Sequence, residues 1–422
     1  TSGTTGSSTG VCLSHHNICS DIYYTCQTVK IYPEDKTLYI LPIHHTYECS
    51  LDFLLVFSKG GTTTYCDGLT KVQKNMAEYN PSILVVVPAL LKVLNKRIKK
   101  AIAADCPAKY KPYYENESLA SALSKTHFLI RKIICSKVRK TLGGNLRLFI
   151  VGAAELDTQL VEDFGALGIR TLQGYGLTEC SPLLAGNNDF HLNVASTGEA
   201  IPGVELKIDN PNEEGIGEIL ARGENIMLGY YNDPEATEAV FRDGWFCTGD
   251  LGYMSKEGLL YVKGRFKSLL ISSDGEKYSP EGIEEALVEK SPYIDQVMLY
   301  NNQSAYTTDV VVPNRDQLIR SLKAQNLDLT TEDGRKAALK ILDGELNKYK
   351  KGGEFEGMFP ERWLPSCFAV LAEPFTEQNQ MINSTMKMVR GKIEKAYANR
   401  IDYLYTAEGK QTFNQQNIDC LK

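Results

Sequence analysis

The 422-residue sequence lacks the features that mark several common protein classes. Its eleven cysteines are scattered without a C-x-x-C pair, so neither a zinc site nor a disulfide framework is predicted, and reduced thiols in the cytoplasm are the simplest interpretation. The seven-residue spacing of Cys12, Cys19 and Cys26 predicts one buried helix face. The longest apolar run, Ile83–Leu91, contains a proline and is too short to cross a bilayer.

Charge of one sign is not in large excess. Lysine and arginine number 46 against 52 acidic residues, a net charge of −6, which argues against a nucleic-acid-binding protein. The hydrophobic and charged fractions, 43% and 23%, are those of an ordinary globular protein. The sequence begins at Thr1 without methionine, charged leader or signal-peptide core, and we expect it to be an N-terminally incomplete piece.

Strand and helix patterns alternate along the first half, which predicts an α/β protein of several domains. Short alternating strands with glycine turns follow from about residue 195 and indicate a β-rich subdomain. A smaller α+β unit is expected from about 268, so the predicted domains are 1–267 and 268–422. The boundary is placed at the glycine-marked, charged turn Gly264–Lys267.

The opening loop Thr1–Gly10 consists of glycine, serine and threonine. Such a loop can surround a phosphate with backbone N–H groups, and the helix expected after it adds a positive N-terminal dipole. A flexible linker has the same composition and is the better interpretation from composition alone. The Gly-Lys-[Ser/Thr] ending of the Walker loop is missing, so a P-loop NTPase is disfavoured.

A second motif, Gln173–Glu179, comes directly after a predicted strand. Its glycines permit a tight turn, Tyr175 offers a face for a base, Thr178 offers a hydroxyl, and Glu179 offers a hard carboxylate for magnesium. It lacks the third glycine of the dinucleotide fingerprint, so it does not indicate NAD binding. An ordinary strand-to-loop turn is an equally good interpretation of this motif taken alone.

Two further segments carry charge at turns. Asp250, in Trp245–Asp250, could bind the two hydroxyls of a ribose, and Arg265, in Lys263–Lys267, could meet a phosphate. Each also has a plain interpretation as a solvated charge.

Taken in order, these segments resemble the adenylate-forming superfamily of acyl-CoA synthetases, adenylation domains and luciferases. The resemblance runs from Thr1 to Arg390 and rests on the segments Thr1–Gly10, Leu41–Glu48, Gly174–Glu179, Gly217–Gly223, Met227–Tyr231, Thr248–Asp250, Gly264–Lys267 and Lys387–Arg390. Within it, Asp243–Lys267 and Asn383–Arg390 are most similar to long-chain fatty acid–CoA ligases. In the opening loop Ser8 and Thr9 stand where the family has Pro-Lys, so a cation near the leaving pyrophosphate is missing.

The resemblance implies ATP-dependent formation of an acyl-adenylate and transfer of the acyl group to coenzyme A, with Mg²⁺ as the metal. Thr178 and Glu179 would hold α-phosphate and Mg²⁺, His45 would line the acyl and adenylate pocket, and Lys387 would neutralise charge as carboxylate and phosphate join. The implied nucleotide and coenzyme residues are Thr1, Ser2, Gly3, Thr4, Thr5, Gly6, Gly152, Ala153, Ala154, Gln173, Gly174, Tyr175, Gly176, Asp250, Arg265 and Gly275. Lys267 would be the hinge of a mobile C-terminal lid.

Residues 91–140 hold thirteen lysines and arginines but three acids, a balance of +10 in an acidic protein. A peripheral contact with the inner face of a membrane would suit a lipid substrate, whereas a solvated helical face is slightly favoured from sequence alone.

Rival functions stay open. An adenylating ligase for aryl or other acids is one, and an amino-acid activator would need an acid after Leu41–Glu48, where Asp52 is the candidate. A non-catalytic nucleotide- or acyl-binding paralogue is another, suggested by the missing loop lysine. The sequence gives neither acyl chain length nor oligomeric state.

Overall fold

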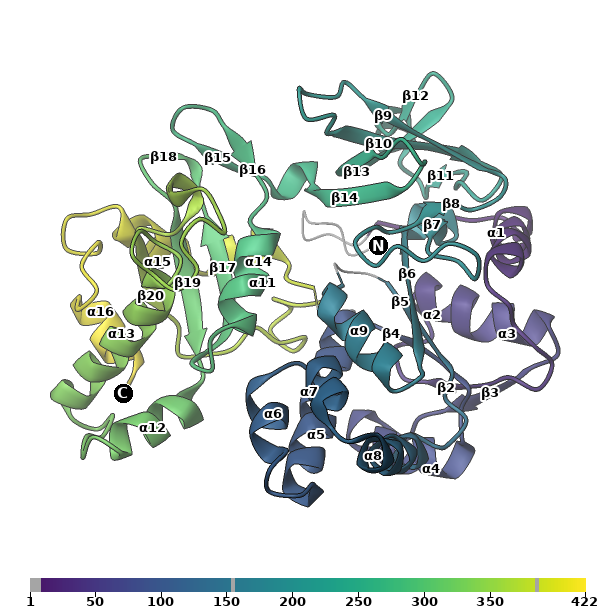
Figure 1. Ribbon diagram of the computed structural model, residues 1–422. Coiled ribbons are helices and arrows are strands. Elements are labelled where there is room, and N and C mark those ends of the chain that lie inside the picture. The colour runs from purple at the N-terminus through teal and green to yellow at the C-terminus, as the bar shows by residue number, and fades with distance from the viewer. Residues whose placement is uncertain (1–8, 153–155, 384–386) are drawn as a thin grey trace. The chain divides into compact units, whose positions relative to one another are not determined.

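The computed structural model describes residues 9–152, 156–383 and 387–422, and these divide into two compact units, 9–263 and 264–422 (Figure 1). The second unit begins at Gly264, the first residue of the turn at which the sequence places a domain boundary. Over these three ranges, no helix is long and apolar enough to cross a membrane. Helices and strands occur together in both units, so the predicted α/β fold class is confirmed.

A seven-stranded sheet organises the first unit. Its order is β3-β2-β4-β5-β6-β7-β8, with bounds Thr62–Tyr65, Lys36–Tyr39, Ile83–Val86, Leu148–Val151, Arg170–Gly176, Leu183–Gly186 and Glu199–Ala200. The pairs from β3 to β6 are parallel, and those from β6 to β8 are antiparallel. The central strands Ile83–Val86 and Leu148–Val151 are buried along their whole length, as expected where helices cover both faces.

Alternate residues of these strands enter two separate cores. Leu84 and Phe149 pack with the core that includes helices α5 to α9, whereas Ile83 and Ile150 pack with the core that includes the segment 46–58. The helices of this unit are α1 (His15–Thr28), α2 (Thr46–Glu48), α3 (Leu55–Ser58), α4 (Val72–Tyr79), α5 (Pro88–Asp105), α6 (Lys111–Asn116), α7 (Leu119–Lys125), α8 (Phe128–Thr141), α9 (Thr158–Ala166) and α10 (Pro234–Ala239). A π-helical turn, Cys49–Leu54, joins α2 to α3.

A second, antiparallel sheet forms the β-rich part. It runs β12-β13-β10-β9 with β14 beside β13, and its bounds are Phe241–Arg242, Trp245–Met254, Gly217–Gly223, Val204–Asp209 and Leu260–Arg265. A two-stranded pair joins β1 (Val11–Cys12) to β11 (Gly229–Tyr230). A β-rich part is therefore present, and its first strand, β9, begins at Val204.

The second unit has two three-stranded sheets. These are β16-β15-β18 and β17-β19-β20, with bounds Lys277–Tyr278, Leu270–Ser272 and Asn302–Ser304, then Ile294–Tyr300, Thr308–Pro313 and Cys367–Val370. The helices are α11 (Glu281–Glu289), α12 (Arg315–Lys323), α13 (Glu332–Asn347), α14 (Arg390–Ala396), α15 (Ala398–Leu404) and α16 (Gln415–Cys420). Apolar residues fill cores on both faces of β17-β19-β20, so this unit has a hydrophobic interior of its own.

One cysteine prediction is wrong. Cys12 lies in β1 rather than in a helix, and Cys19, although in α1, is exposed. The buried face of α1 is polar instead and includes Asn17, Asp21 and Thr25. Of the three cysteines Cys26 alone lies in the helix and packs, partly buried, against a core, whereas polar side chains with specific partners occupy the buried positions.

Candidate functional site

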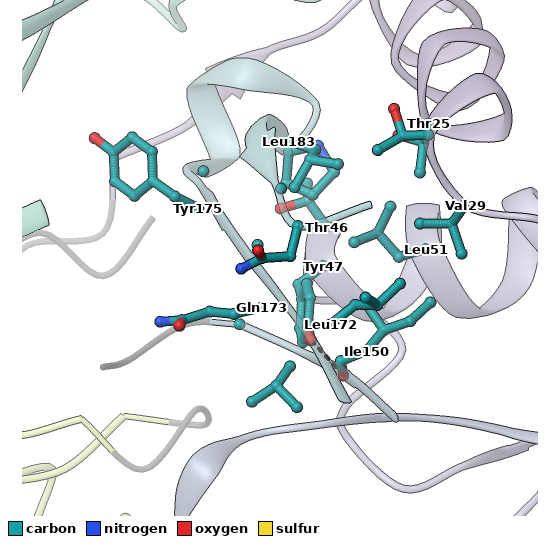
Figure 2. Close-up of a pocket in the computed structure, with 18 of the residues that line it drawn as sticks. Thr25, Val29, Thr46, Tyr47, Leu51, Ile150, Leu172, Gln173, Tyr175 and Leu183 are labelled. Atoms are coloured by element: carbon teal, nitrogen blue, oxygen red, sulfur yellow. Dashed lines mark hydrogen bonds between the residues drawn. The ribbon is translucent and has the colours of Figure 1, made fainter. Parts of the chain in front are cut away.

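A pocket lies at the carboxyl ends of β5 and β6, and its empty space, including the part open to solvent, is about 690 Å³ (Figure 2). Open α/β sheets bind ligands at this edge. The lining divides by chemistry into a polar part and an apolar part. The polar part includes His45, Thr46, Gly152, Gln173, Gly174, Gly176 and Thr178, and the apolar part includes Val29, Leu51, Ile150, Leu172 and Leu183. One hollow therefore offers both a polar and an apolar environment.

Tyr47 lines this cavity and is held in place by its hydroxyl group. Its hydroxyl lies 3.2 Å from the carbonyl oxygen of Val86 and 3.0 Å from that of Ile150, so the phenol ties α2 to the ends of β4 and β5 (Figure 2). His45 precedes α2 as its N-cap, and its Nδ1 accepts a hydrogen bond of 3.2 Å from the backbone N–H of Tyr47. The neighbouring His44 is exposed. His45 rather than His44 thus belongs to the cavity wall.

Gly152 packs face-on against Tyr47. A Cβ atom at Gly152 would lie 3.0 Å from Tyr47 Cε2 and 3.2 Å from Cζ, so a side chain here would have to displace the ring. The strand end is therefore pressed against the phenol, and its backbone borders the cavity directly. Ala153 and Ala154, the other residues of this predicted turn, and Thr1–Gly6 of the predicted phosphate loop lie outside the described residues.

The glycines of Gln173–Glu179 do not make the tight turn that the sequence predicts. Gly174 and Gly176 belong to β6 and pair with Gly186 and Leu183 of β7. A Cβ at Gly176 would lie 1.9 Å from the carbonyl oxygen of Pro182. These glycines are needed because β7 approaches β6 too closely for a side chain, and the chain turns only after Gly176.

Thr178 and Glu179 form a short 3-10 helix directly after β6. The Thr178 hydroxyl lies 3.4 Å from that of Thr46, at the cavity wall. Glu179 is 9% exposed, and its Oε1 accepts a hydrogen bond of 3.0 Å from the hydroxyl of Tyr230. Its backbone carbonyl also accepts from the N–H of Met227, so the segment 227–230 holds both the main chain and the carboxylate.

Tyr175 and Asp250 contact each other. The phenol of Tyr175 donates a hydrogen bond of 2.8 Å to Asp250 Oδ2, and both side chains are buried. In Figure 2 the Tyr175 ring points away from the group around Tyr47 and Leu51. Burial and the neighbouring Asp250 charge raise the pKa of Tyr175 well above its usual value, so the phenol stays a donor. Two residues predicted to act separately on a base and a ribose are thus joined.

Helix α1 anchors the loops that carry this site. Asn17 donates to the carbonyl oxygens of Glu224 and Ile226, at 2.7 and 2.9 Å. One turn later, Asp21 accepts from the backbone N–H of Leu183 at 3.0 Å and from the side-chain amide of Asn225 at 3.3 Å. The segment that follows Glu179, at Leu183, and the segment that precedes Tyr230, at 224–226, are therefore both hydrogen-bonded to one face of α1.

Burial changes the titration of the acids around this site. It raises the pKa of Asp21 to about 8, although the hydrogen bonds from Asn225 and Leu183 oppose the shift. Burial also raises the pKa values of Glu48 and Asp52 above their ordinary range, since both carboxyls lie one helical turn apart in the interior. Glu48 Oε1 accepts from the N–H groups of Ile40 and Leu41, so this acid braces the end of β2.

The remaining predicted residues belong to the second unit. Arg265 ends β14, Lys267 lies in the 3-10 turn Phe266–Ser268, and Gly275 lies in the turn between β15 and β16 with φ +85°. Lys387 is exposed. Its backbone N–H donates a hydrogen bond of 2.9 Å to Asn383 Oδ1, and its carbonyl oxygen accepts one of 2.9 Å from the backbone N–H of Asn383.

The AMP-binding enzyme model matches residues 1–231, more than half of the chain. The chain belongs to the AMP-binding enzyme family. The matched range contains the predicted phosphate loop and the segment Gln173–Glu179, and it ends just after Tyr230.

Two curated relatives of this AMP-binding enzyme are acid-activating proteins. "Probable acyl-activating enzyme 16, chloroplastic" of Arabidopsis thaliana is 28% identical over 96% of this chain and 62% of its own length. "Long-chain-fatty-acid–CoA ligase 1" of Homo sapiens is 27% identical over 96% of this chain and 60% of its own length. The chain thus spans about three fifths of the curated relatives that it matches.

Solved structures of this fold include O-succinylbenzoate coenzyme A synthetase from Bacillus subtilis in complex with ATP and magnesium ion. It aligns with a TM-score of 0.65 and 22% identity over 93% of this chain and 68% of its own. At this identity the likeness shows the fold.

The residues present fit a magnesium nucleotide. Mg²⁺ bound with nucleotide phosphates commonly takes one or two protein carboxylates, and Glu179 supplies a fixed one beside the Thr178 hydroxyl. Among the described residues no cluster of three or more His, Cys, Asp or Glu side chains forms a ready-made metal site. A single carboxylate agrees with a metal that arrives with its phosphates.

Sequence reasoning missed the residues that hold these groups in place. Tyr230 lies inside the segment Met227–Tyr231 that supports the family resemblance, so its position was noted but not its role. Asp21, Asn17 and Asn225 gave no signal, because their partners are about 160 to 210 positions away in the sequence.

Proposed function

We propose that this protein activates a long-chain fatty acid with ATP and transfers the acyl group to coenzyme A, releasing AMP and pyrophosphate. The observation that carries this proposal is the convergence of His45, Thr178 and the strand-end glycine Gly152 on one cavity whose other wall is apolar. Glu179 directly follows Thr178 in the same 3-10 helix. Relatives named as long-chain fatty acid–CoA ligases support the substrate and the thiol.

In the first half-reaction, a carboxylate oxygen of the acid forms a bond to the α-phosphorus of ATP, and the bond from this phosphorus to the pyrophosphate oxygen breaks. No protein nucleophile is required, so the protein's task is to place the reactants and stabilise negative charge. Thr178 and Glu179 would hold the α-phosphate and Mg²⁺, and the metal supplies electrostatic stabilisation of the phosphoryl charge. Tyr230 keeps the Glu179 carboxylate in one orientation.

The ribose is assigned to Asp250. One of its oxygens accepts from Tyr175. A carboxylate fixed in this way is already oriented for ribose hydroxyls, so little rotamer freedom is lost on binding. Tyr175 would then serve by ordering Asp250 through its hydroxyl, with its ring face left to stack on the base.

Lys387 is assigned to the first half-reaction and the turn at Gly275 to the second. In the second step the coenzyme A sulfur forms a bond to the acyl carbonyl carbon, and the bond from this carbon to the AMP oxygen breaks. The negative carboxylate and the negative α-phosphate are brought together in the first step alone, which is where a lysine ammonium helps. Lys267, in the 3-10 turn at the start of the second unit, is the proposed hinge.

The apolar part of the cavity favours a hydrocarbon acid. Val29, Leu51 and Leu172 offer no partner for a charged substrate group. An amino-acid activator would need an anchoring acid, and Asp52 does not provide one because it is fully buried and is not among the residues that line the cavity. The amino-acid alternative is therefore disfavoured.

An aryl acid is the second candidate substrate, because an apolar wall accepts a ring as well as a chain and O-succinylbenzoate coenzyme A synthetase shares the fold. ATP–pyrophosphate exchange with the full-length protein would separate the substrates. We expect exchange with long-chain fatty acids and little with benzoates or amino acids. Preference for an aryl acid would overturn the assignment, and ATP binding in calorimetry without any exchange would favour a non-catalytic paralogue.

A further inference from the structure

Helix α8 places three large apolar side chains in water. Phe128, Leu129 and Ile133 are 61%, 54% and 67% exposed. Apolar side chains scattered singly over a surface are ordinary, but these three fall within six residues of one helix. A group of exposed apolar side chains of this kind indicates a surface that binds another molecule.

The opposite side of α8 is already packed. Val138 is buried, and Ile130, Ile134 and Cys135 pack against the core that includes α5, α7 and α9. The helix therefore has a fixed rotation about its axis. Its outer face cannot turn inward without removing this second set of apolar side chains from the core.

Helical spacing puts apolar and basic side chains on the same outer face. Leu129, Lys132, Ile133, Ser136 and Lys140 are separated by three or four residues and all are exposed. The remaining cations of the helix are Arg131, Lys137 and Arg139, and α8 contains no acidic residue. The outer face thus combines the apolar side chains of Leu129 and Ile133 with the lysines Lys132 and Lys140.

Neighbouring helices extend the basic surface. Lys96, Arg97 and Lys100 of α5 are exposed. Lys137 of α8 forms an ion pair of 2.5 Å with Asp105 at the end of α5, so the two helices adjoin there and one lysine charge is offset. The excess positive charge of 91–140 therefore lies on the surface of this part of the fold.

We propose that this surface, α8 with the exposed basic residues of α5, binds the headgroup region of an anionic phospholipid bilayer. Interfacial helices combine lysines that meet lipid phosphates with apolar side chains that enter the acyl boundary. A nucleic acid would use the cations and leave Leu129 and Ile133 in water, and an acidic protein would need a shaped partner for them. The charge and the apolar group together match a lipid surface.

The proposal goes beyond the proposed function and does not depend on it, because lipid binding can be measured without ATP, acid or coenzyme A. The test is co-sedimentation of the chain with vesicles of phosphatidylcholine alone or mixed with phosphatidylglycerol. We expect binding to the mixed vesicles, and we expect it to weaken steeply as salt is raised.

Two variants separate the contributions. Lys132→Gln with Lys140→Gln should weaken binding about 30-fold, since each surface lysine contributes roughly a factor of five. Leu129→Ser with Ile133→Ser should weaken it on the order of tenfold. Lys256→Gln and Leu192→Ser change exposed residues elsewhere in the same unit and should leave binding unchanged. All six substituted residues are exposed, so melting temperatures should stay near that of the parent.

Three results would overturn the proposal. The first is no sedimentation with the mixed vesicles at low salt. The second is equal loss in the control variants. The third is full binding by the Leu129→Ser, Ile133→Ser variant, because it would mean that the helix attracts lipid by charge without entering the interface.

Discussion

The phenol of Tyr230 donates a hydrogen bond of 3.0 Å to Oε1 of Glu179, across 51 positions of sequence. This bond leaves the carboxylate with one fixed oxygen and sets the direction of the other. The carboxylate proposed to meet magnesium is therefore oriented by a residue that touches neither metal nor substrate in the proposed reaction.

Tyr230→Phe should raise the Mg²⁺ concentration for half-maximal ATP–pyrophosphate exchange by about tenfold, as expected for losing a hydrogen bond to a charged group. The rate at saturating Mg²⁺ should change little, because the carboxylate itself remains. Tyr231→Phe is the matched control, since that side chain is 68% exposed. A fall in the saturated rate with an unchanged Mg²⁺ requirement would contradict a positioning role.

Asp250→Ala should weaken AMP binding about tenfold to a hundredfold, because it removes charge-assisted contacts to the ribose. Tyr175→Phe should weaken it less, since it only frees the Asp250 carboxylate to rotate. The double variant should be no weaker than Asp250→Ala, because the two residues act as one unit. Calorimetric titration with AMP measures all three affinities, and additive losses would show that Tyr175 contributes independently.

Asp21→Asn should flatten the dependence of stability on pH. Burial raises the pKa of Asp21 to about 8, so the folded chain binds a proton there that the unfolded chain releases near pH 4. Stability is then full at acid pH and falls as pH rises toward 8, by up to about 1.4 kcal/mol per pH unit. Asparagine carries no such proton and keeps an oxygen for the N–H of Leu183.

Urea unfolding of the parent and the Asp21→Asn variant between pH 5 and 9 measures this slope. Asp243→Asn is the control, because Asp243 is exposed and its φ of +51° suits asparagine. Identical slopes in the parent and the Asp21 variant would show that Asp21 is ionised in the folded chain.

Lys387→Ala should lose acyl-adenylate formation by about 10²–10³ in the full-length protein, as for removal of one electrostatic contact to a developing charge. Conversion of supplied acyl-adenylate and coenzyme A to acyl-CoA should survive. Lys395→Ala, an exposed lysine of α14, is the matched control. Equal loss of both half-reactions would refute the assignment of Lys387 to the first step.

Local sequence patterns predicted many of the strands and helices, but they could not predict contacts between residues far apart in the sequence. The buried run Ile83–Val86 and the glycine-marked turn at Gly264 were visible because each depends on its own neighbours in sequence. The glycines of β6 were misinterpreted as a turn, because the reason for them is the backbone of Pro182 in the approach to β7.

Contacts between residues far apart in the sequence were also missed at the candidate site. Residue type and motif order are enough to propose Glu179 and Asp250 as site residues, but they do not reveal the partners Tyr230 and Tyr175. Tyr175 was assigned to a base because a lone aromatic next to glycines suggests stacking. The hydrogen bond from its hydroxyl to Asp250 joins residues 75 positions apart, so only the folded structure reveals it.

The spacing of Asn17 and Asp21 along α1 sets where the two loops that they bind can lie. Asn17 and Asp21 point to the same side because they are one turn apart, and each holds a different loop. Adding or removing a single residue between them would rotate one contact by about 100° relative to the other. Replacement of the exposed residue Cys19 should therefore be tolerated, whereas any insertion or deletion between Asn17 and Asp21 should break one of the two contacts. Among related sequences, the number of residues in this stretch should vary less than the residue types within it.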